Sequence, residues 1–213
     1  MNDSAREHRN PITHYSKPIE VGIFIFDEVE VLDFAGPFEV LSLAAENGAK
    51  CFHVCTIAVN NARVVARNGL QVLPDYSFDD EKHMDILIVP GGHGAQRERK
   101  NSAVIEWIKK VDKTTTITAS VCTGALILAE TKLLDNKKAT THWMYFNQVE
   151  EEYPAIEMIR NTKYVEDGKI ITSAGISAGI DMSFFIVQKL LGKNVAVETA
   201  KRMEYDITFS ADV

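Results

Sequence analysis

The sequence predicts an α/β fold in which helices alternate with the strands of a mostly parallel sheet. Continuous apolar runs rich in β-branched and aromatic residues, such as Val21 to Phe26, are typical of strands covered on both faces. Segments whose apolar residues recur at helical spacing follow several of these runs, after turns that contain glycine or proline. Strands that alternate with helices form βαβ units with right-handed crossovers, and such units build a parallel sheet.

In the first half of the chain, the strand from Val21 to Phe26 leads through an acidic turn to a helix. Gly36 and Pro37 introduce this helix, and Gly48 is its expected stop. Further predicted elements are a strand over residues 51–59, a short strand or hairpin arm from Gly69 to Leu73, a buried strand and glycine turn from Asp85 to Gly92, a helix from Ser102 to Lys110, and a strand from Thr115 to Val121.

In the second half, a helix is predicted to start directly after Cys122. The later elements are a helix from His142 to Glu152, short strands from Ile156 to Arg160 and Lys169 to Ser173, and helices from Ser177 to Leu191 and Val195 to Glu204. The chain shows no internal repeat, low-complexity tract or linker. We therefore expect a polar N-terminal arm over residues 1–18 and a single domain over residues 19–213.

Composition excludes several functional classes. The 213 residues include 23 Lys and Arg against 30 Asp and Glu, so the formal net charge is 23 − 30 = −7. This acidic balance provides no broad basic surface for nucleic acid. No apolar stretch approaches the roughly 18 residues of a membrane span, and the first twenty residues lack the apolar core of a secretory signal. A cytoplasmic protein that binds neither nucleic acid nor membrane is expected.

The three cysteines raise the question of which thiol reacts. Their odd number and spacing do not suggest a disulfide framework, and no CxxC pair or His/Cys cluster indicates a zinc site. Cys51 and Cys55 lie four residues apart in a predicted strand, among apolar residues that are typical of core. Cys122 instead lies between a predicted strand and its helix, where the helix macrodipole favours the thiolate. Cys122 is therefore the best candidate nucleophile.

Two other features follow predicted strands at the same edge of the sheet. Asp33 follows the first strand, and the turn containing Gly91 and Gly92 follows the strand that ends at Val89. The amides of Gly92 and Thr123 are predicted to converge as an anion hole beside the Cys122 sulfur, with Asp33 as acid or base. Because an ionised Asp33 would repel a thiolate, we expect the two groups to share a proton.

Each of these residues also has a structural interpretation. A single cysteine at a strand end is often an inert, half-buried side chain. The two glycines alone indicate only a turn, and Asp33 alone could cap the helix near Gly36. The coincidence of all three at strand ends favours a reactive site.

The motifs VLDFAGPFEVL, ILIVPGGHG, SVCTGALILAETKLLDNKKATTHW and SAGISAGIDMSFFIV resemble those of the PfpI/ThiJ superfamily. Within it, the sequence is most similar to isonitrile hydratases and to the amidase-like domain of AraC-type regulators. The resemblance extends from Val21 to about Asp206. It implies a three-layer sandwich of the flavodoxin-like, class I glutamine-amidotransferase-like type, because this is the fold of the superfamily.

The resemblance also implies roles for particular residues. It places the family nucleophile on Cys122 and the essential aspartate of isonitrile hydratases on Asp33. The implied reaction hydrates an isonitrile to an N-substituted formamide through a thioimidate on Cys122, with no metal or organic cofactor. His142 matches a histidine that is common near the active site of the superfamily, often across a subunit boundary, although it could equally be a helix-start residue. A homodimer that acts on a small-molecule substrate is expected.

The superfamily offers three alternatives to this reaction. Peptidases of the superfamily carry a histidine directly after the nucleophile, whereas this chain has Thr123. A glyoxalase or deglycase would use the same thiol on a small carbonyl compound. A noncatalytic sensor of a ligand or of oxidation is the main rival, and the absence of a recognisable helix-turn-helix segment before Val213 favours an enzyme over a DNA-binding regulator.

Overall fold

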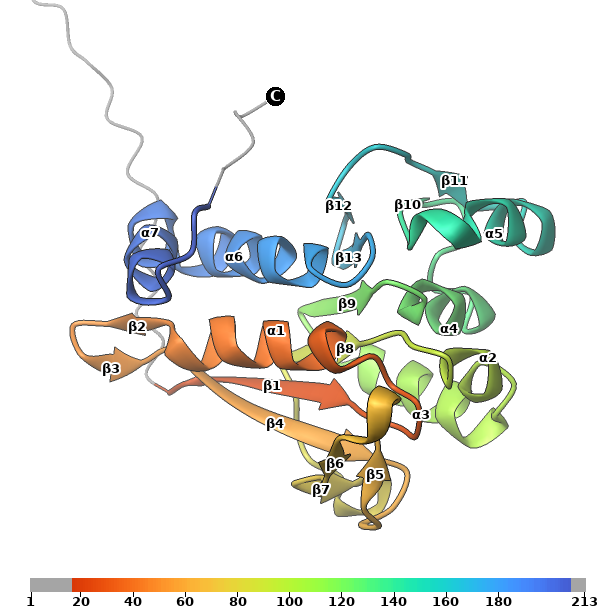
Figure 1. Cartoon of the computed structure of the whole chain (residues 1–213), viewed down its shortest axis with the longest axis horizontal. Coiled ribbons are helices and arrows are strands. Elements are labelled where there is room, and N and C mark those ends of the chain that lie inside the picture. Colours follow the sequence, from red (N-terminus) through yellow and green to blue (C-terminus); the bar gives the residue numbers. More distant parts are fainter. Residues whose placement is uncertain (1–16, 208–213) are drawn as a thin grey trace, which may run out of the picture.

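The computed structural model of the protein describes residues 17–207 (Figure 1). The predicted N-terminal arm, residues 1–18, lies almost wholly outside the described residues. The division of the chain into an arm and a single domain stays a prediction. No helix of the described part is long and apolar enough to cross a membrane.

A seven-stranded sheet forms the middle of the structure, in the order β12-β13-β9-β8-β1-β4-β7. Its strands are β1 (Ile19–Phe24), β4 (Phe52–Ala58), β7 (Tyr76–Ser77), β8 (Ile86–Val89), β9 (Ile117–Val121), β12 (Tyr164–Asp167) and β13 (Ile170–Ser173). Neighbouring strands are parallel except for β12 and β13. The chain runs outward from β1 to β4 and β7, then crosses to β8 on the other side of β1. Ligands of such sheets bind at the carboxyl ends of the strands near this reversal.

Helices cover both faces of the sheet, which gives three layers (Figure 1). The helices are α1 (Val31–Leu43), α2 (Ala95–Glu98), α3 (Ser102–Asp112), α4 (Gly124–Glu130), α5 (Phe146–Glu152), α6 (Ala178–Leu191) and α7 (Lys193–Arg202). The first, sixth and seventh pack together on one face, and α2, α3 and α4 lie on the other. The predicted α/β fold with a mostly parallel sheet is confirmed.

Short elements complete the described chain. Three two-stranded sheets are formed by β2 (Ala45–Glu46) with β3 (Ala49–Lys50), β5 (Val64–Val65) with β6 (Gln71–Val72), and β10 (Lys138–Ala139) with β11 (Glu157–Met158). The 3-10 helices are η1 (Arg67–Gly69), η2 (Phe78–Asp80) and η3 (Trp143–Tyr145). The hairpin of β5, η1 and β6 projects beside the carboxyl ends of β1 and β4 (Figure 1).

Burial explains why the apolar runs become central strands. All four residues of β8 are fully buried, as are Val21, Ile23 and Phe24 of β1. Strands covered on both faces require apolar side chains at successive positions, and these runs supply them. The predicted central strands are therefore confirmed.

Several elements differ from the sequence prediction, and α1 and β12 are two of them. The helix expected after Gly36 and Pro37 begins earlier, at Val31, and Pro37 lies inside it. Proline removes one helical hydrogen bond, but Pro37 is buried, and that packing favours the continuous helix. The edge strand β12 was not predicted. It pairs with β13 across a turn at Gly168, a pairing that depends on the tertiary contact more than on local pattern.

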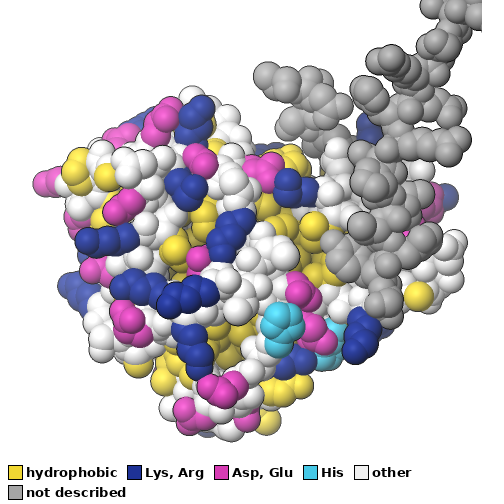
Figure 2. Space-filling model, turned by 180° about the vertical axis from the view of Figure 1, so that it is seen from behind, with side chains coloured by type: hydrophobic (Ala, Val, Ile, Leu, Met, Phe, Trp, Pro, Cys, Tyr) yellow, Lys and Arg dark blue, Asp and Glu magenta, His cyan; other side chains and the backbone are white. Residues whose placement is uncertain are grey.

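The surface carries charges of both signs. On the face drawn in Figure 2, basic and acidic side chains are interspersed, with hydrophobic side chains between them. Thirteen ion pairs are found among the described residues, and many join side chains that are exposed to solvent. Exposed pairs of this kind contribute little to stability.

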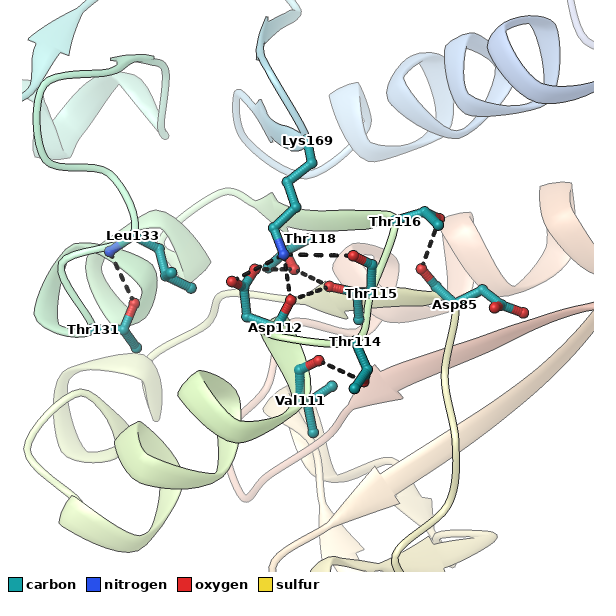
Figure 3. Close-up of polar contacts among 10 residues, drawn as sticks. All are labelled: Asp85, Val111, Asp112, Thr114, Thr115, Thr116, Thr118, Thr131, Leu133 and Lys169. Carbon is teal, nitrogen blue, oxygen red and sulfur yellow. Dashed lines mark hydrogen bonds and ion pairs between the residues drawn. The ribbon is translucent and has the colours of Figure 1, made fainter.

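One buried polar cluster joins α3 to the sheet near the start of β9 (Figure 3). Asp112, at the end of α3, is only 8% exposed and accepts a hydrogen bond of 2.7 Å from the Thr118 hydroxyl on β9. The Lys169 ammonium lies 3.0 Å from the same carboxylate, and the hydroxyls of Thr115 and Thr118 are 2.9 Å apart. The cluster joins α3, β9 and the turn before β13, because each of these elements supplies a partner to the others.

Replacing Asp112 with alanine should destabilise the protein by about 2–4 kcal/mol, because it leaves buried partners unpaired. Urea denaturation measures the change in the free energy of unfolding. The control is Lys109→Ala, which removes an exposed pair with Glu106 and should change stability by less than about 0.5 kcal/mol. A loss below about 1 kcal/mol for Asp112→Ala would contradict the role assigned to this cluster.

Candidate active site

Cys122 occupies a sharp turn between β9 and α4. Its φ of +57° lies in the left-handed region, which is strained for a residue other than glycine. Contacts with two neighbouring segments hold this conformation. The Cys122 amide donates to the carbonyl oxygens of Ser173 and Ala174, both at 3.2 Å, and its carbonyl accepts a 2.8 Å hydrogen bond from the Thr141 hydroxyl. The strained turn is therefore fixed by the surrounding structure, which projects the thiol at the carboxyl edge of the sheet.

A glycine at the start of α4 makes the turn possible. A Cβ atom at Gly124 would collide with the carbonyl oxygen of Val89 at the end of β8. Only glycine lets the helix begin this close to the neighbouring strand. The Cys122 turn thus packs directly against the end of β8, which leads into the glycine turn.

Asp33 lies in the first turn of α1, with its side chain fully buried. Its Oδ2 accepts a 3.0 Å hydrogen bond from the Gly91 amide, and its Oδ1 has no hydrogen-bond partner of regular geometry. The pKa of this carboxyl is raised to about 7, because burial and, less strongly, the nearby Glu30 carboxylate outweigh the lowering effects of the Gly91 amide and the Cys122 thiol. Glu30, not Asp33, is the N-cap residue of the helix. The alternative that Asp33 serves as a helix cap is therefore wrong.

The Cys122 thiol is protonated at neutral pH. Its pKa is raised to about 12, because burial and the Asp33 carboxyl outweigh the lowering effect of hydrogen bonds from the Thr123 and Ile176 amides. The thiolate expected from the helix macrodipole is wrong. Cys122 is only 6% exposed, and α4 is too short for its dipole to offset desolvation and a neighbouring acid.

Asp33 and Cys122 therefore form a coupled acid and thiol. The two side chains interact with one another, and both have raised pKa values. Near pH 7 the Cys122 thiol is protonated, and the Asp33 carboxyl group is protonated in only part of the molecules. This arrangement is consistent with the expected sharing of a proton, because two ionised groups in this buried site would repel each other.

The glycine turn packs against the Cys122 turn as predicted, but its amides have other partners. The Gly92 amide donates to the Thr123 hydroxyl at 2.9 Å, and that hydroxyl in turn donates to the Gly92 carbonyl at 3.2 Å. A Cβ at Gly91 would lie 2.5 Å from the Thr123 nitrogen, so glycine is needed for this approach. The Thr123 amide contacts the sulfur, whereas the Gly92 amide is bonded to Thr123. A joint anion hole of Gly92 and Thr123 stays a prediction.

A third loop, residues 174–176, reaches the sulfur and was not predicted. The Ile176 amide hydrogen-bonds to Cys122, and Ile176 has a φ of +53°. A β-branched residue in the left-handed region is strained, so the surrounding loop must hold it there. This loop follows β13, another strand that ends at the same edge. The sequence contains a signal for this loop. The motif SAGIS begins at the last residue of a predicted strand, and the other predicted site residues also follow strands.

His142 lies beside this third loop. Its Nδ1 accepts a 3.3 Å hydrogen bond from the Met144 amide, so it is the N-cap of η3, and its ring packs against the backbone of Gly175. Burial lowers its pKa, which favours the neutral imidazole with its proton on Nε2. Both earlier interpretations describe part of its position, because His142 starts a helical turn and lies next to the loop that contacts Cys122.

The other two thiols lie away from this site. Cys55 is buried in β4, its thiol faces the Val21 carbonyl at 3.4 Å, and burial raises its pKa to about 11. Cys51 is half-buried and packs against the core. Among residues 17–207, no group of three or more His, Cys, Asp or Glu side chains is arranged to hold a metal ion.

Comparisons with known proteins find both enzymes and regulators. A profile of the DJ-1/PfpI family matches residues 20–189. An isonitrile hydratase of Pseudomonas putida is 31% identical over 188 residues, which cover 88% of this chain and 78% of that protein. The HTH-type transcriptional regulator CdhR of Pseudomonas aeruginosa is 29% identical over 172 residues, which cover 81% of this chain and 51% of the regulator. The chain thus spans about half the length of this regulator.

Solved structures show the same fold. The crystal structure of a THiJ/PfpI family protein from Pseudomonas syringae superposes with a TM-score of 0.81 at 23% identity, and covers 100% of this chain and 84% of that chain. An AraC family transcriptional regulator from Pseudomonas putida superposes with a TM-score of 0.76 at 18% identity, over 87% of this chain and 100% of that chain. These likenesses confirm the predicted fold class.

Replacing Asp33 with asparagine should speed alkylation of Cys122 at pH 8–9. The variant removes the negative charge that raises the thiol pKa, and each unit by which that pKa falls gives about tenfold more thiolate. Iodoacetamide labelling followed by peptide mass spectrometry measures the rate at Cys122 separately from Cys51. The exposed acid variant Asp79→Asn is the control. A rate at Cys122 that is unchanged in Asp33→Asn would show that the carboxyl does not influence the thiol.

Burial of Asp33 should also make stability depend on pH. Its pKa rises from 3.8 to about 7 on folding, so the folded protein holds the proton more tightly than the unfolded chain. The resulting stabilisation is complete below about pH 4 and is lost as the pH rises to about 7. At pH 8, Asp33→Asn should therefore be more stable than the parent protein by about 2–4 kcal/mol, and this gain should shrink towards pH 4. Urea denaturation at pH 4, 6 and 8 tests this, and a gain independent of pH would contradict it.

Proposed function

The chain belongs to the DJ-1/PfpI family, and from this premise we propose that it is an isonitrile hydratase-like lyase that converts an isonitrile and water to an N-substituted formamide. The observation that carries the proposal is the buried pair of Asp33 and Cys122, in which a carboxyl group with a pKa of about 7 contacts a neutral thiol. The 31% identity to an isonitrile hydratase supports the choice of reaction.

The first step forms a carbon–sulfur bond. The Cys122 sulfur attacks the terminal carbon of the isonitrile, Asp33 delivers a proton to that carbon, and the thiol proton passes to the carboxylate that remains. The product is a thioimidate, in which the former isonitrile carbon carries one hydrogen, the sulfur and a double bond to nitrogen. Because the thiol is neutral at rest, the acid and the nucleophile must act together, which their direct interaction allows.

The second step consumes water. Water adds to the carbon–nitrogen double bond, the nitrogen takes up a proton, and the carbon–sulfur bond breaks as the carbonyl forms. The released thiol regains its proton, and the sum is one isonitrile plus one water to one formamide. The Thr123 and Ile176 amides, which hydrogen-bond to the sulfur, stabilise negative charge on it when it attacks and when it leaves. The proposed reaction uses only protein groups and water.

A noncatalytic ligand sensor is the second candidate, because the chain is similar to transcriptional regulators such as CdhR over 81% of its length. Such a sensor would bind a small molecule at the same site without turnover. A sensor of oxidation has less support, since Cys122 is only 6% exposed and a buried thiol with a raised pKa oxidises slowly. A homodimer and a cytoplasmic location remain predictions that rest on the family resemblance and the composition.

The proposed function predicts formamide production that depends on Cys122. The parent protein, incubated with alkyl and aryl isonitriles, should yield the matching formamides by liquid chromatography and mass spectrometry. Cys122→Ala should reduce the rate to the uncatalysed background, and Asp33→Asn should lower kcat by about 10²–10⁴-fold. Cys51→Ser is the matched thiol control and should retain the parent rate.

Other results would select a different function. An unchanged formamide yield in Cys122→Ala would refute the covalent mechanism. Saturable binding of a small ligand, measured by calorimetry and lost on substitution of the site, would favour the sensor if no isonitrile is consumed. Consumption of methylglyoxal in place of isonitriles would favour a glyoxalase or deglycase.

A further inference from the structure

An ion pair involves Glu30, the N-cap residue of the helix that carries Asp33. The Arg67 guanidinium, in η1, is 2.9 Å from the Glu30 carboxylate at the start of α1. The Glu30 side chain is 14% exposed and that of Arg67 is 38% exposed, so the pair is partly shielded from water. Neither residue contacts the Cys122 thiol in any hydrogen bond of the described structure.

Backbone hydrogen bonds place Glu30 at a fixed position relative to Asp33. The Glu30 amide donates to the Gly91 carbonyl at 2.9 Å, and the Glu30 carbonyl accepts from the Asp33 amide at 3.2 Å. The Gly91 amide then donates to Asp33 Oδ2 at 3.0 Å, which closes a ring of three residues. A shift of Glu30 would therefore move both the helix turn that carries Asp33 and the amide that binds its carboxyl group.

The position of Arg67 is fixed in the same way. Its amide donates to the Val29 carbonyl at 2.9 Å, and the Glu28 amide donates to the Val65 carbonyl at 2.8 Å. The Val65 amide donates to Asp27 Oδ1, also at 2.8 Å. The hairpin of β5, η1 and β6 is thus bound to the segment between β1 and α1. An arginine anchored by its backbone loses less side-chain freedom in an ion pair than one on a mobile loop.

Glu30 is a nearby charge that acts on Asp33. Its carboxylate raises the pKa of Asp33, as burial does, whereas the Gly91 amide and the Cys122 thiol lower it. Charged groups on the surrounding elements have other partners, or face solvent. In α6, Asp181 binds Lys163 and Tyr205. After the glycine turn, Arg97 binds Glu98 and the Asp27 carbonyl, and His93 is exposed. At the start of η3, His142 accepts a hydrogen bond from the Met144 amide.

We propose that Glu30 and Arg67 form a positioning pair for Asp33, in which the Arg67 guanidinium binds the Glu30 carboxylate and so holds it beside the helix turn that carries Asp33. The proposal rests on the proposed function in so far as Asp33 is the acid of that reaction. Neither residue touches substrate in this scheme. The Glu30 carboxylate keeps the proton of Asp33 available near neutral pH, and the backbone contacts of the pair hold the carboxyl group against the Gly91 amide.

The test measures the titration midpoint of the Asp33 carboxyl directly. Aspartate labelled with ¹³C at the carboxyl carbon gives an NMR signal that Asp33→Asn identifies. Glu30→Gln should lower the midpoint by about half a pH unit or more, because it removes the negative charge, and Arg67→Met should lower it by a smaller amount, because it frees the Glu30 carboxylate to move into solvent. The double variant should match Glu30→Gln, and Arg67→Lys should stay close to the parent value.

An effect of Arg67 that disappears without Glu30 is the signature of the proposal. A merely structural role of Arg67 would admit water to Asp33 whether or not Glu30 is present, so the double variant would fall below Glu30→Gln, and this result would overturn the proposal. So would a raised midpoint in Arg67→Met, or a midpoint within about 0.2 units of the parent value in either single variant. Lys110→Met, which breaks an exposed pair with Glu81 far from the site, is the control and should leave the midpoint unchanged. Circular dichroism confirms that each variant is folded.

Activity provides an independent second readout. If Asp33 is the acid, the pH at which kcat/KM for an isonitrile falls on the alkaline side should move with the NMR midpoint, downward in Glu30→Gln and, to a smaller extent, in Arg67→Met. The two hypotheses fail in different ways. A parent protein that makes no formamide refutes the proposed function and leaves the NMR titration to decide on the pair, whereas an active parent with unmoved midpoints refutes only the pair.

Discussion

The burial of an acid beside a thiol is the constraint on which the rest of this structure depends. Asp33 and Cys122 are both almost inaccessible to water, and burial is the largest cause of the raised pKa of each. Ionising both groups in this position is unfavourable. The fold must therefore supply hydrogen-bond partners for the polar atoms of the Asp33 carboxyl and the Cys122 thiol. The Gly91 amide serves the carboxyl oxygen, and the Thr123 and Ile176 amides serve the sulfur.

These partners come from loops that follow four different parallel strands. The segment after β1 supplies Asp33, the turn after β8 supplies Gly91, the turn after β9 supplies Cys122 and Thr123, and the loop after β13 supplies Ile176. Their convergence requires backbone conformations that are unfavourable in isolation, including positive φ at Cys122 and Ile176. Such strain persists only where the surrounding structure fixes it, here through hydrogen bonds between neighbouring loops and a buried sheet beneath them.

The protonation of the pair bears on what the site can do. A neutral thiol that faces a carboxyl group titrating near pH 7 suits a substrate that must gain a proton as the sulfur attacks it, as an isonitrile carbon does. The same burial makes the thiol a slow target for oxidation. Relatives that include an enzyme and transcriptional regulators show that this fold accompanies different functions, so the chemistry of the site must decide between them.

The sequence by itself determined the α/β class, the central strands and the strand ends at which Asp33, Gly91 and Cys122 lie, because buried runs and glycine turns are local signals. It also separated Cys122 from the two thiols that lie away from the site. Only the tertiary structure decided the protonation of the thiol, since burial and Asp33 outweigh the helix dipole that a local view emphasises. The Ile176 amide, the Thr123 partner of Gly92 and the pairing of Glu30 with Arg67 likewise depend on contacts between segments distant in the chain, which no local pattern specifies.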